Sequence, residues 1–268
     1  MNLAELASEW MSRCSFYGCR ETEEVTKLRR PLGLSKLLLL FATLLGVAVV
    51  GSAYPLPGTT PLPTGTSGLF VSLVPPGTPE GVLLDSSADP FSFVTGSGTF
   101  KGTIFSAVFR ESSGTLDFYY QIENTSTATG INDPSTVSRL TVISFAGFLT
   151  DVGFRTDGST LPGGIFADGT KPPDLSDRSS GAGTLVGFNW GTSFNSDKIF
   201  TGERSNVVVV STNATQFNHL GAESVIDVAS QTVSGRLQPT AAVPEPVTMM
   251  MLGGGLFGLG VLRFRKRA

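Results

Sequence analysis

Leu116-Asp117-Phe118-Tyr119-Tyr120-Gln121-Ile122-Glu123-Asn124 is the stretch that most clearly indicates the fold class. Leu, Phe, Tyr and Ile occupy its first, third, fifth and seventh positions, and Asp117, Tyr119, Gln121 and Glu123 alternate with them. Successive side chains of a β-strand point to opposite faces. The alternation therefore predicts a half-buried strand, with one face toward a core and the other toward solvent.

Short apolar runs separated by Gly, Asn, Asp and Pro recur along the chain on both sides of this stretch. The further predicted strands are Leu69–Val74, Phe91–Val94, Thr99–Arg110, Val137–Phe148, Leu185–Trp190, Val207–Val210, Ser224–Val228 and Thr232–Leu237. The unbroken valine run predicts a strand covered on both faces, and the last two strands are spaced as a hairpin. No long segment has a 3.6-residue period. We therefore expect an all-β body, an antiparallel sandwich or a jelly-roll-like fold.

The body divides by composition into a leading segment and a β-rich domain. Residues 54–80 are rich in Pro and Gly and predict extended chain, and residues 81–242 form the predicted extracellular domain. Within that domain, Thr156–Gly183 has few apolar residues and several Asp-Gly, Gly-Gly and Pro-Pro pairs. It predicts a long loop, and loops of this length are usually functional or mobile.

Charge and cysteine content restrict what the body can do. Residues 54–242 hold sixteen acidic and nine basic side chains, a net charge of −7, and this balance argues against nucleic acid as a partner. Both cysteines, Cys14 and Cys19, precede the body. The body therefore cannot contain disulfides, a cysteine nucleophile or a thiolate metal site.

A catalytic constellation is not evident from the sequence. His219 is the single histidine, with no Gly-x-Ser-x-Gly elbow to accompany it, and we expect it to face solvent. Asp117 and Glu123 share a strand face, but six residues separate them by roughly 20 Å, too far for a glycosidase pair. Pairing of either acid with Asp85, Asp151 or Asp227 needs tertiary information. Solvated surface acids are the simpler interpretation.

Binding functions have weak signals of their own. Four aspartates of the long loop could supply oxygen ligands for calcium, but their spacing matches no known calcium loop: Asp157, Asp168, Asp174 and Asp177. An outward Tyr119 together with Trp190 could form a platform for sugar stacking, although Trp190 fits a core position better. We predict no cofactor and no metal.

The front of the chain has the organisation of an export signal. Residues 1–26 are polar, and residues 27–53 join a basic region to an apolar run and to small residues. This is the pattern of a secretory signal peptide with a signal helix, and it predicts cleavage between Ala53 and Tyr54. Residues 1–26 are either a long cytoplasmic leader or the result of a start codon assigned too far upstream.

The last 26 residues, 243–268, have three parts. The first is Val243-Pro244-Glu245-Pro246, which two prolines keep extended and accessible. Val247 to Leu262 follows without a charge and would span roughly 24 Å as a transmembrane helix. Four basic residues close the chain and predict a cytoplasmic C-terminus: Arg263, Arg265, Lys266 and Arg267.

The order of Pro-Glu-Pro, a short apolar helix and a basic cluster resembles the PEP-CTERM protein-sorting signal of Gram-negative bacteria. The resemblance implies recognition and cleavage near the motif by a membrane-embedded exosortase. It also implies transient anchoring in the inner membrane before transfer to the cell surface or extracellular matrix. An ordinary C-terminal anchor is the alternative. Leu116–Asn124 and Ser205–Phe217 are also similar to uncharacterised bodies found ahead of such tails.

We therefore expect an exported protein, without enzymatic activity, that has a structural or adhesive role with extracellular polysaccharide. Its expected partners are signal peptidase and the secretion machinery, the exosortase-type protease, and exopolysaccharide. Two alternatives remain open. One is a carbohydrate-binding module, and the other is a secreted hydrolase with a cleft containing paired carboxylates.

Overall fold

The computed structural model describes residues 55–95, 98–128, 136–192, 197–227 and 230–241. These residues form strands and one 3-10 turn, with no α-helix among them, and none of their helical segments could cross a membrane. The elements are β1 (Thr60–Pro61), β2 (Leu69–Phe70), β3 (Ser72–Leu73), β4 (Val82–Thr95), β5 (Gly98–Arg110), β6 (Leu116–Asn124), β7 (Thr127–Ala128), β8 (Arg139–Ile143), β9 (Thr150–Arg155), η2 (Gly158–Thr160), β10 (Leu175–Arg178), β11 (Leu185–Asn189), β12 (Val207–Thr212), β13 (Gln216–Ile226) and β14 (Ser230–Thr240). The predicted all-β class is confirmed.

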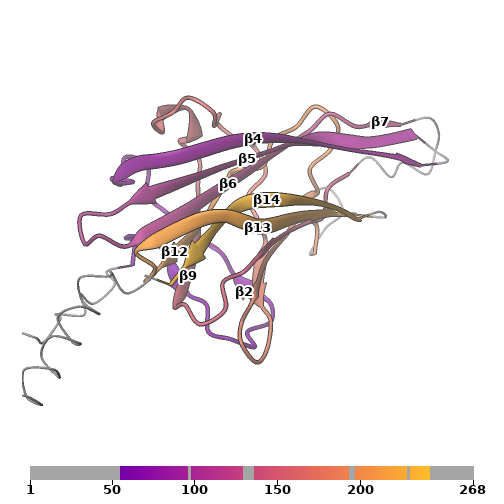
Figure 1. Cartoon of the computed structure of the whole chain (residues 1–268). Helices are drawn as coiled ribbons and strands as arrows, with labels where there is room; N and C mark the ends of the chain where they lie inside the picture. The colour runs from indigo at the N-terminus through magenta and orange to yellow at the C-terminus, as the bar shows by residue number, and fades with distance from the viewer. Residues whose placement is uncertain (1–54, 96–97, 129–135, 193–196, 228–229, 242–268) are drawn as a thin grey trace, which may run out of the picture. The chain divides into compact units, whose positions relative to one another are not determined.

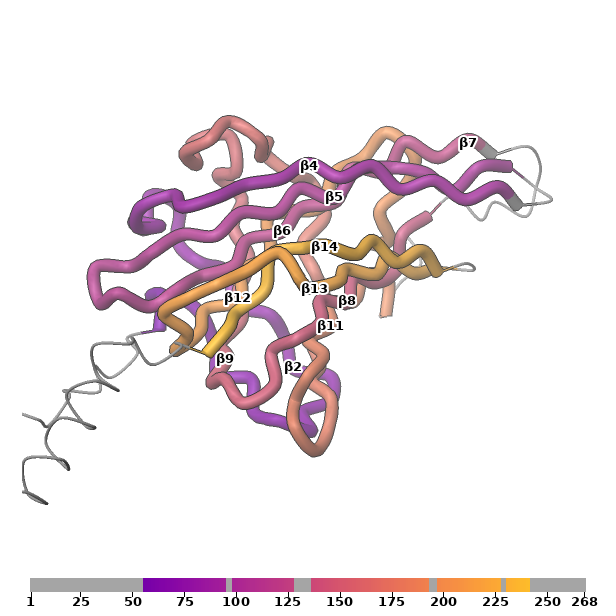
Figure 2. Tube along the Cα trace, in the orientation of Figure 1, coloured from indigo at the N-terminus to yellow at the C-terminus, as the bar shows by residue number. Residues whose placement is uncertain are grey.

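The strands build two sheets (Figures 1 and 2). The eight-stranded sheet has the order β1-β9-β12-β6-β5-β4, with β3 added beside β9 and β7 beside β5. The six-stranded sheet has the order β14-β13-β8-β11-β10-β2. All pairings are antiparallel except that of β3 with β9. The predicted hairpin near the C-terminus is β13–β14, and it is longer than the sequence pattern indicated.

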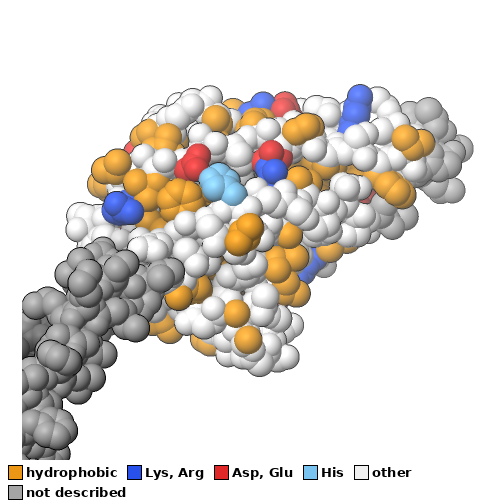
Figure 3. Space-filling view, in the orientation of Figure 1, with side chains coloured by type: hydrophobic (Ala, Val, Ile, Leu, Met, Phe, Trp, Pro, Cys, Tyr) orange, Lys and Arg blue, Asp and Glu red, His pale blue; other side chains and the backbone are white. Residues whose placement is uncertain are grey.

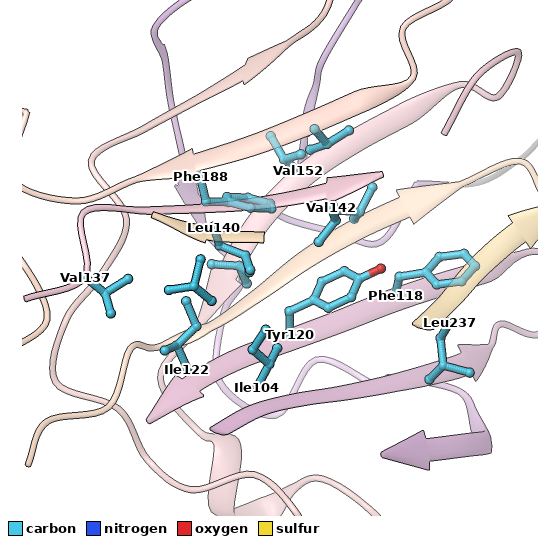
Figure 4. Close-up of a cluster of buried hydrophobic side chains, with 14 of the residues drawn as sticks. Ile104, Phe118, Tyr120, Ile122, Val137, Leu140, Val142, Val152, Phe188 and Leu237 are labelled. Atoms are coloured by element: carbon cyan, nitrogen blue, oxygen red, sulfur yellow. The ribbon is translucent and has the colours of Figure 1, made fainter. Parts of the chain in front are cut away.

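The main core lies between the two sheets. Figure 4 shows Phe118, Tyr120 and Ile122 of β6 in one cluster with Leu140 of β8 and Phe188 of β11. All five side chains are buried, which removes a large apolar area from water and stabilises the face-to-face packing. The apolar alternation in Leu116–Asn124 therefore identified the inward face of β6 correctly.

The opposite face of β6 is buried as well, so the prediction of a half-buried strand is wrong. Tyr119 of β6 packs in a second cluster with Val207 and Val209 of β12. Leu161 and Phe166, from the segment after β9, cover these side chains. The valine run of β12 is buried on both faces, as its composition predicted.

The predicted long loop at Thr156–Gly183 is in part a structural cover. Gln121 of β6 donates from Nε2 to the Ala167 and Ser205 carbonyls, at 2.7 and 2.9 Å, and the Ala167 amide donates back to Gln121 Oε1. The loop then re-enters the six-stranded sheet as β10, which the sequence did not reveal. The polar composition of this stretch gave no sign that part of it packs against the sheets.

Two further strand boundaries differ from expectation. The strand predicted to reach Phe148 ends at Ile143, because Ser144 adopts a φ of 88° and the chain turns. The Arg178 guanidinium holds this turn by donating to the carbonyls of Phe145 and Phe148, at 3.0 and 2.7 Å. Strand β9 was missed, and Gly153 inside it weakens the local strand pattern. A Cβ at Gly153 would lie 2.8 Å from Val74, so the glycine permits close packing of the leading segment.

The leading segment, residues 55–80, is joined to the sheets. Its predicted strand Leu69–Val74 is two short strands, β2 in one sheet and β3 in the other. Leu56 and Leu62 are 2% and 0% exposed, so apolar anchors hold the proline-rich chain against the body.

Candidate functional site

Three polar side chains form a row across the outer face of the eight-stranded sheet. Ser211 of β12 lies opposite Asp117 of β6 on one side and opposite Asp151 of β9 on the other. Neighbouring strands lie about 4.8 Å apart, so the two aspartates are separated by about 10 Å along the row. The fold thus supplies the carboxylate pairing that sequence reasoning left to tertiary structure.

Asp117 is fully buried, which corrects its interpretation as a solvated surface acid. Burial, followed by the proximity of the Glu111 carboxyl, holds the pKa of Asp117 well above its usual range. Burial also raises the pKa of Asp151. Glu111 lies in the turn between β5 and β6 and was not singled out from the sequence. Because burial favours its neutral form, Asp117 can remain in the interior without a cationic partner.

The space beside this row is small. A pocket of about 60 Å³ is lined by Asp151, Ser211 and residues of the neighbouring turns: Pro55, Leu149, Thr212 and Asn213. This volume corresponds to about two water molecules, whereas pockets for small-molecule ligands are typically about 300–1,000 Å³. The Leu56 amide also donates to Ser211 Oγ at 3.3 Å. The arrangement fits a structural contact between strands, without room for a sugar substrate.

An ion-pair network lies further along the same sheet face. Arg155, 1% exposed, donates from Nε and Nη2 to the two Asp157 oxygens, both at 2.9 Å, and its Nη1 lies 3.9 Å from Glu80. These hydrogen bonds are the main cause that lowers the pKa of Asp157 to about 2. Asp157 also accepts from the Gly77 amide, so the network fixes the leading segment to the end of β9.

The four aspartates considered as calcium ligands point to separate partners. Asp157 bonds Arg155, Asp168 accepts from the Ser159 amide, Asp174 accepts from Thr192, and Asp177 pairs with Arg139. Among the residues that the structure describes, no cluster of three or more metal-binding side chains is found. Each aspartate is used to fix a turn or a strand end.

Polar and charged groups gather where the β13–β14 hairpin meets β4 and β5, a contact that we call the polar seam. His219 of β13 lies 2.9 Å from Asp85 of β4, and Arg236 of β14 pairs with Asp89 of β4. His219 is solvent-facing, as predicted, and its side chain is 56% exposed. Figure 3 shows the single histidine at the surface among acidic and basic side chains.

Glu223 of β13 lies beneath this surface and was missed from the sequence. It is 1% exposed, and neither of its carboxyl oxygens has a well-formed hydrogen bond to a described residue. Burial raises its pKa to about 8, and the Ser106 hydroxyl of β5 offsets part of that rise. Alternation with Val225 was the available signal, because residues two apart on a strand share a face.

The proposed aromatic platform does not form. Tyr119 is 0% exposed, so the prediction that it faces outward is wrong. Trp190 is 1% exposed, which confirms its core position. The exposed aromatic rings that the structure describes are phenylalanines: Phe70 at 76%, Phe93 at 45% and Phe200 at 40%. Lys171 lies over the Phe200 ring, 5.4 Å from its centroid.

The predicted processing sites lie outside the described residues. They are the signal cleavage site Ala53 and Tyr54, the motif Val243, Pro244, Glu245 and Pro246, the apolar segment Val247–Leu262, and the basic residues Arg263, Arg265, Lys266 and Arg267. The leader 1–26 and the signal peptide 27–53 also lie outside them. These assignments remain predictions from the sequence.

Comparison with protein families gives one finding. Residues 242–267 match the PEP-CTERM protein-sorting motif. No curated protein and no solved structure matches the chain. The match begins two residues after the end of β14 and covers the segment in which the sequence predicted a sorting signal.

Proposed function

From the premise that this exported protein carries a PEP-CTERM sorting signal, processed by exosortase-type machinery during a membrane-anchored step, we propose a non-enzymatic function for its body. The β-sandwich has a structural or adhesive role in contact with extracellular polysaccharide, at the cell surface or in the matrix. Export begins with removal of a signal peptide between Ala53 and Tyr54. Val247–Leu262 then anchors the chain with its basic end in the cytoplasm.

The observation that supports a non-catalytic body is that its acidic side chains are buried or paired within the fold. Asp117 is fully buried, Asp157 is bound by Arg155, and Glu223 is buried between the sheets. The pocket beside Asp151 has a volume of about 60 Å³, which is small for a substrate. A hydrolase needs acids that reach a substrate with room for water between them. Four aspartates instead hold turns and strand ends in place: Asp157, Asp168, Asp174 and Asp177.

A carbohydrate-binding module is the second candidate, and the exposed phenylalanines favour it. Phe70 lies on β2 at the edge of the six-stranded sheet, and Phe200 lies under Lys171. Apolar faces of sugar rings stack on exposed aromatic rings. A binding module would hold polysaccharide at these exposed phenylalanine rings. A structural body would instead contact polysaccharide through a larger part of its surface.

Polysaccharide retention distinguishes these two roles. The producer's own polysaccharide is immobilised, and the wild-type chain is compared with Phe70→Ala, Phe200→Ala and the core-neutral control Val94→Ala. Loss of retention in the phenylalanine variants alone supports the binding module. Equal retention in all of them supports the structural role. Release of soluble sugar from the polysaccharide by the wild-type chain would contradict a non-enzymatic function.

The sorting claim has a separate test. Replacement of Pro244, Glu245 and Pro246 by alanine is expected to leave the chain uncleaved in the membrane fraction, because the helix-permissive alanines remove the extended motif. Cell fractionation followed by immunoblotting measures this outcome. Normal release of the triple variant would overturn the proposed route.

A further inference from the structure

The β13–β14 hairpin is attached to the rest of the described body by few backbone contacts. β13 pairs with β8 only over Glu223–Ile226, and the remaining part of β13 pairs with β14 alone. A register irregularity at Gly221 separates these two parts. Half of the hairpin therefore rests on side-chain contacts with the eight-stranded sheet, which lies beside it in Figures 1 and 2.

Those side-chain contacts are partly polar. Asp85 with His219 and Asp89 with Arg236 tie the hairpin to β4, and the buried Glu223 faces Ser106 of β5. Ser87 and Ser106 bond one another at 3.0 Å beneath the seam. Leu237 of β14, 2% exposed, supplies an apolar anchor. A seam of this composition opens more easily than a wholly apolar one, since the freed polar groups gain water.

The hairpin is also the last folded element before the sorting motif. β14 ends at Thr240, and the matched motif begins at residue 242. While β14 is docked, the four residues from Thr240 to Pro244 span at most about 14 Å. Release of the eleven residues of β14 would add up to about 36 Å of extended chain.

We propose that the β13–β14 hairpin is a latch: it undocks from β4 and β5, and β14 separates from β13 while the remaining sandwich stays folded. This separation lengthens the tether that presents the sorting motif. The inference rests on the proposed sorting route. Ionisation of Glu223 is the trigger, because burial between the sheets destabilises the charged carboxylate. The Tyr120 hydroxyl is the titratable group that interacts with Glu223. The charged groups of the polar seam, Asp85, Asp89, His219 and Arg236, pair with one another.

Hydrogen–deuterium exchange on the full-length chain in detergent micelles tests the latch. The measured quantity is the protection of β13–β14 peptides relative to β6 and β12 peptides in the same sample, so intrinsic pH effects cancel. We expect this relative protection to fall at least about ten-fold between about pH 6 and about pH 9 in the wild type. It should change less than about two-fold in Glu223→Gln. Asp151→Asn, a partly buried acid away from the seam, is the matched control and should behave as wild type.

Two results would overturn the latch. One is simultaneous loss of protection in the hairpin and the central strands, and the other is an unchanged pH response in Glu223→Gln. The tether is tested by processing in producer membranes, where Glu223→Gln is expected to slow cleavage. An eleven-residue Gly-Ser insertion between Ala242 and Val243 should restore it. Processing of Glu223→Gln at the wild-type rate would refute the tether, whereas processing of the Pro-Glu-Pro triple variant would refute the sorting route and leave the exchange result standing.

Discussion

At the centre of the sandwich, β6 and β12 face β8 and β11 across apolar side chains. At its side the β13–β14 hairpin meets β4 and β5 across charged and hydroxyl-bearing side chains as well as apolar ones such as Leu237. The same two sheets therefore contact each other in two chemical environments. At the centre, stability comes from removal of apolar area from water. At the polar seam, each buried polar group costs free energy unless it is neutral or paired.

The two contacts therefore respond differently to pH and salt. The central contact changes little with pH or salt, because its side chains carry no charge. The polar seam depends on the protonation of Glu223 and on ion pairs that reach solvent. The region nearest to the sorting motif is thus the one whose packing responds to conditions.

The largest expected effect comes from breaking the central contact. Phe118 is 0% exposed and packs edge-on against Phe145, with ring centroids 5.6 Å apart. Phe118→Ala should lower the free energy of unfolding by about 3–5 kcal/mol, since it leaves a cavity. Urea denaturation followed by circular dichroism measures the loss. If the alanine variant does not fold, Phe118→Leu should cost less, about 1–2 kcal/mol, and Val94→Ala at a 75% exposed site should change little. Equal effects at Phe118 and Val94 would contradict the assigned core.

The next effect concerns Glu223 and has a defined sign. Its pKa is about 8 in the folded protein, against an ordinary value of 4.5. The folded state therefore binds the proton more tightly, and stability falls as pH rises from about 4.5 to about 8. The difference in unfolding free energy between Glu223→Gln and wild type should shift by about 3 kcal/mol in favour of the variant between about pH 5 and about pH 8. Parallel curves of unfolding free energy against pH for the two proteins would show that folding does not raise the pKa of Glu223.

The smallest expected effect is at the exposed edge of the polar seam. His219→Ala removes a pair with Asp85 in which both side chains reach solvent, so it should cost at most about 1 kcal/mol, and less at high salt. Thermal unfolding in low and high salt measures it. A loss as large as that of Phe118→Ala would mean that the hairpin depends on this one ion pair.

Strand content was predictable because period-two alternation and β-branched runs depend on local sequence. The alternation in Leu116–Asn124 gave the correct inward face, but it could not reveal that Leu161 and Phe166 return to cover the other face. Polar residues such as Asp117 and Gln121 predicted a solvent-facing side of the strand. Both are buried in the fold, where Gln121 donates to the Ala167 carbonyl. Strand β10 was hidden because it lies in a polar stretch and is held by pairing with β11.

The candidate sites also differ in whether their residues are contiguous in the sequence or are brought together by the fold. The sorting motif at 242–267 was recognisable because its three parts are contiguous in sequence. The row of Asp117, Ser211 and Asp151 joins three strands distant in the chain, and only their register brings them together. Glu223 was accessible in principle from its alternation with Val225, yet its unpaired carboxyl depends on what β5 and β6 place opposite it.

The central claim is that a folded β-sandwich is exported and then separated from its sorting tail. Intact mass spectrometry of the protein from the membrane and extracellular fractions of producing cells tests it most directly. We predict an extracellular form that begins near Tyr54, ends near Val243 and lacks Val247–Leu262. An extracellular form that retains the tail, or a protein found only at full length in the membrane, would contradict the account.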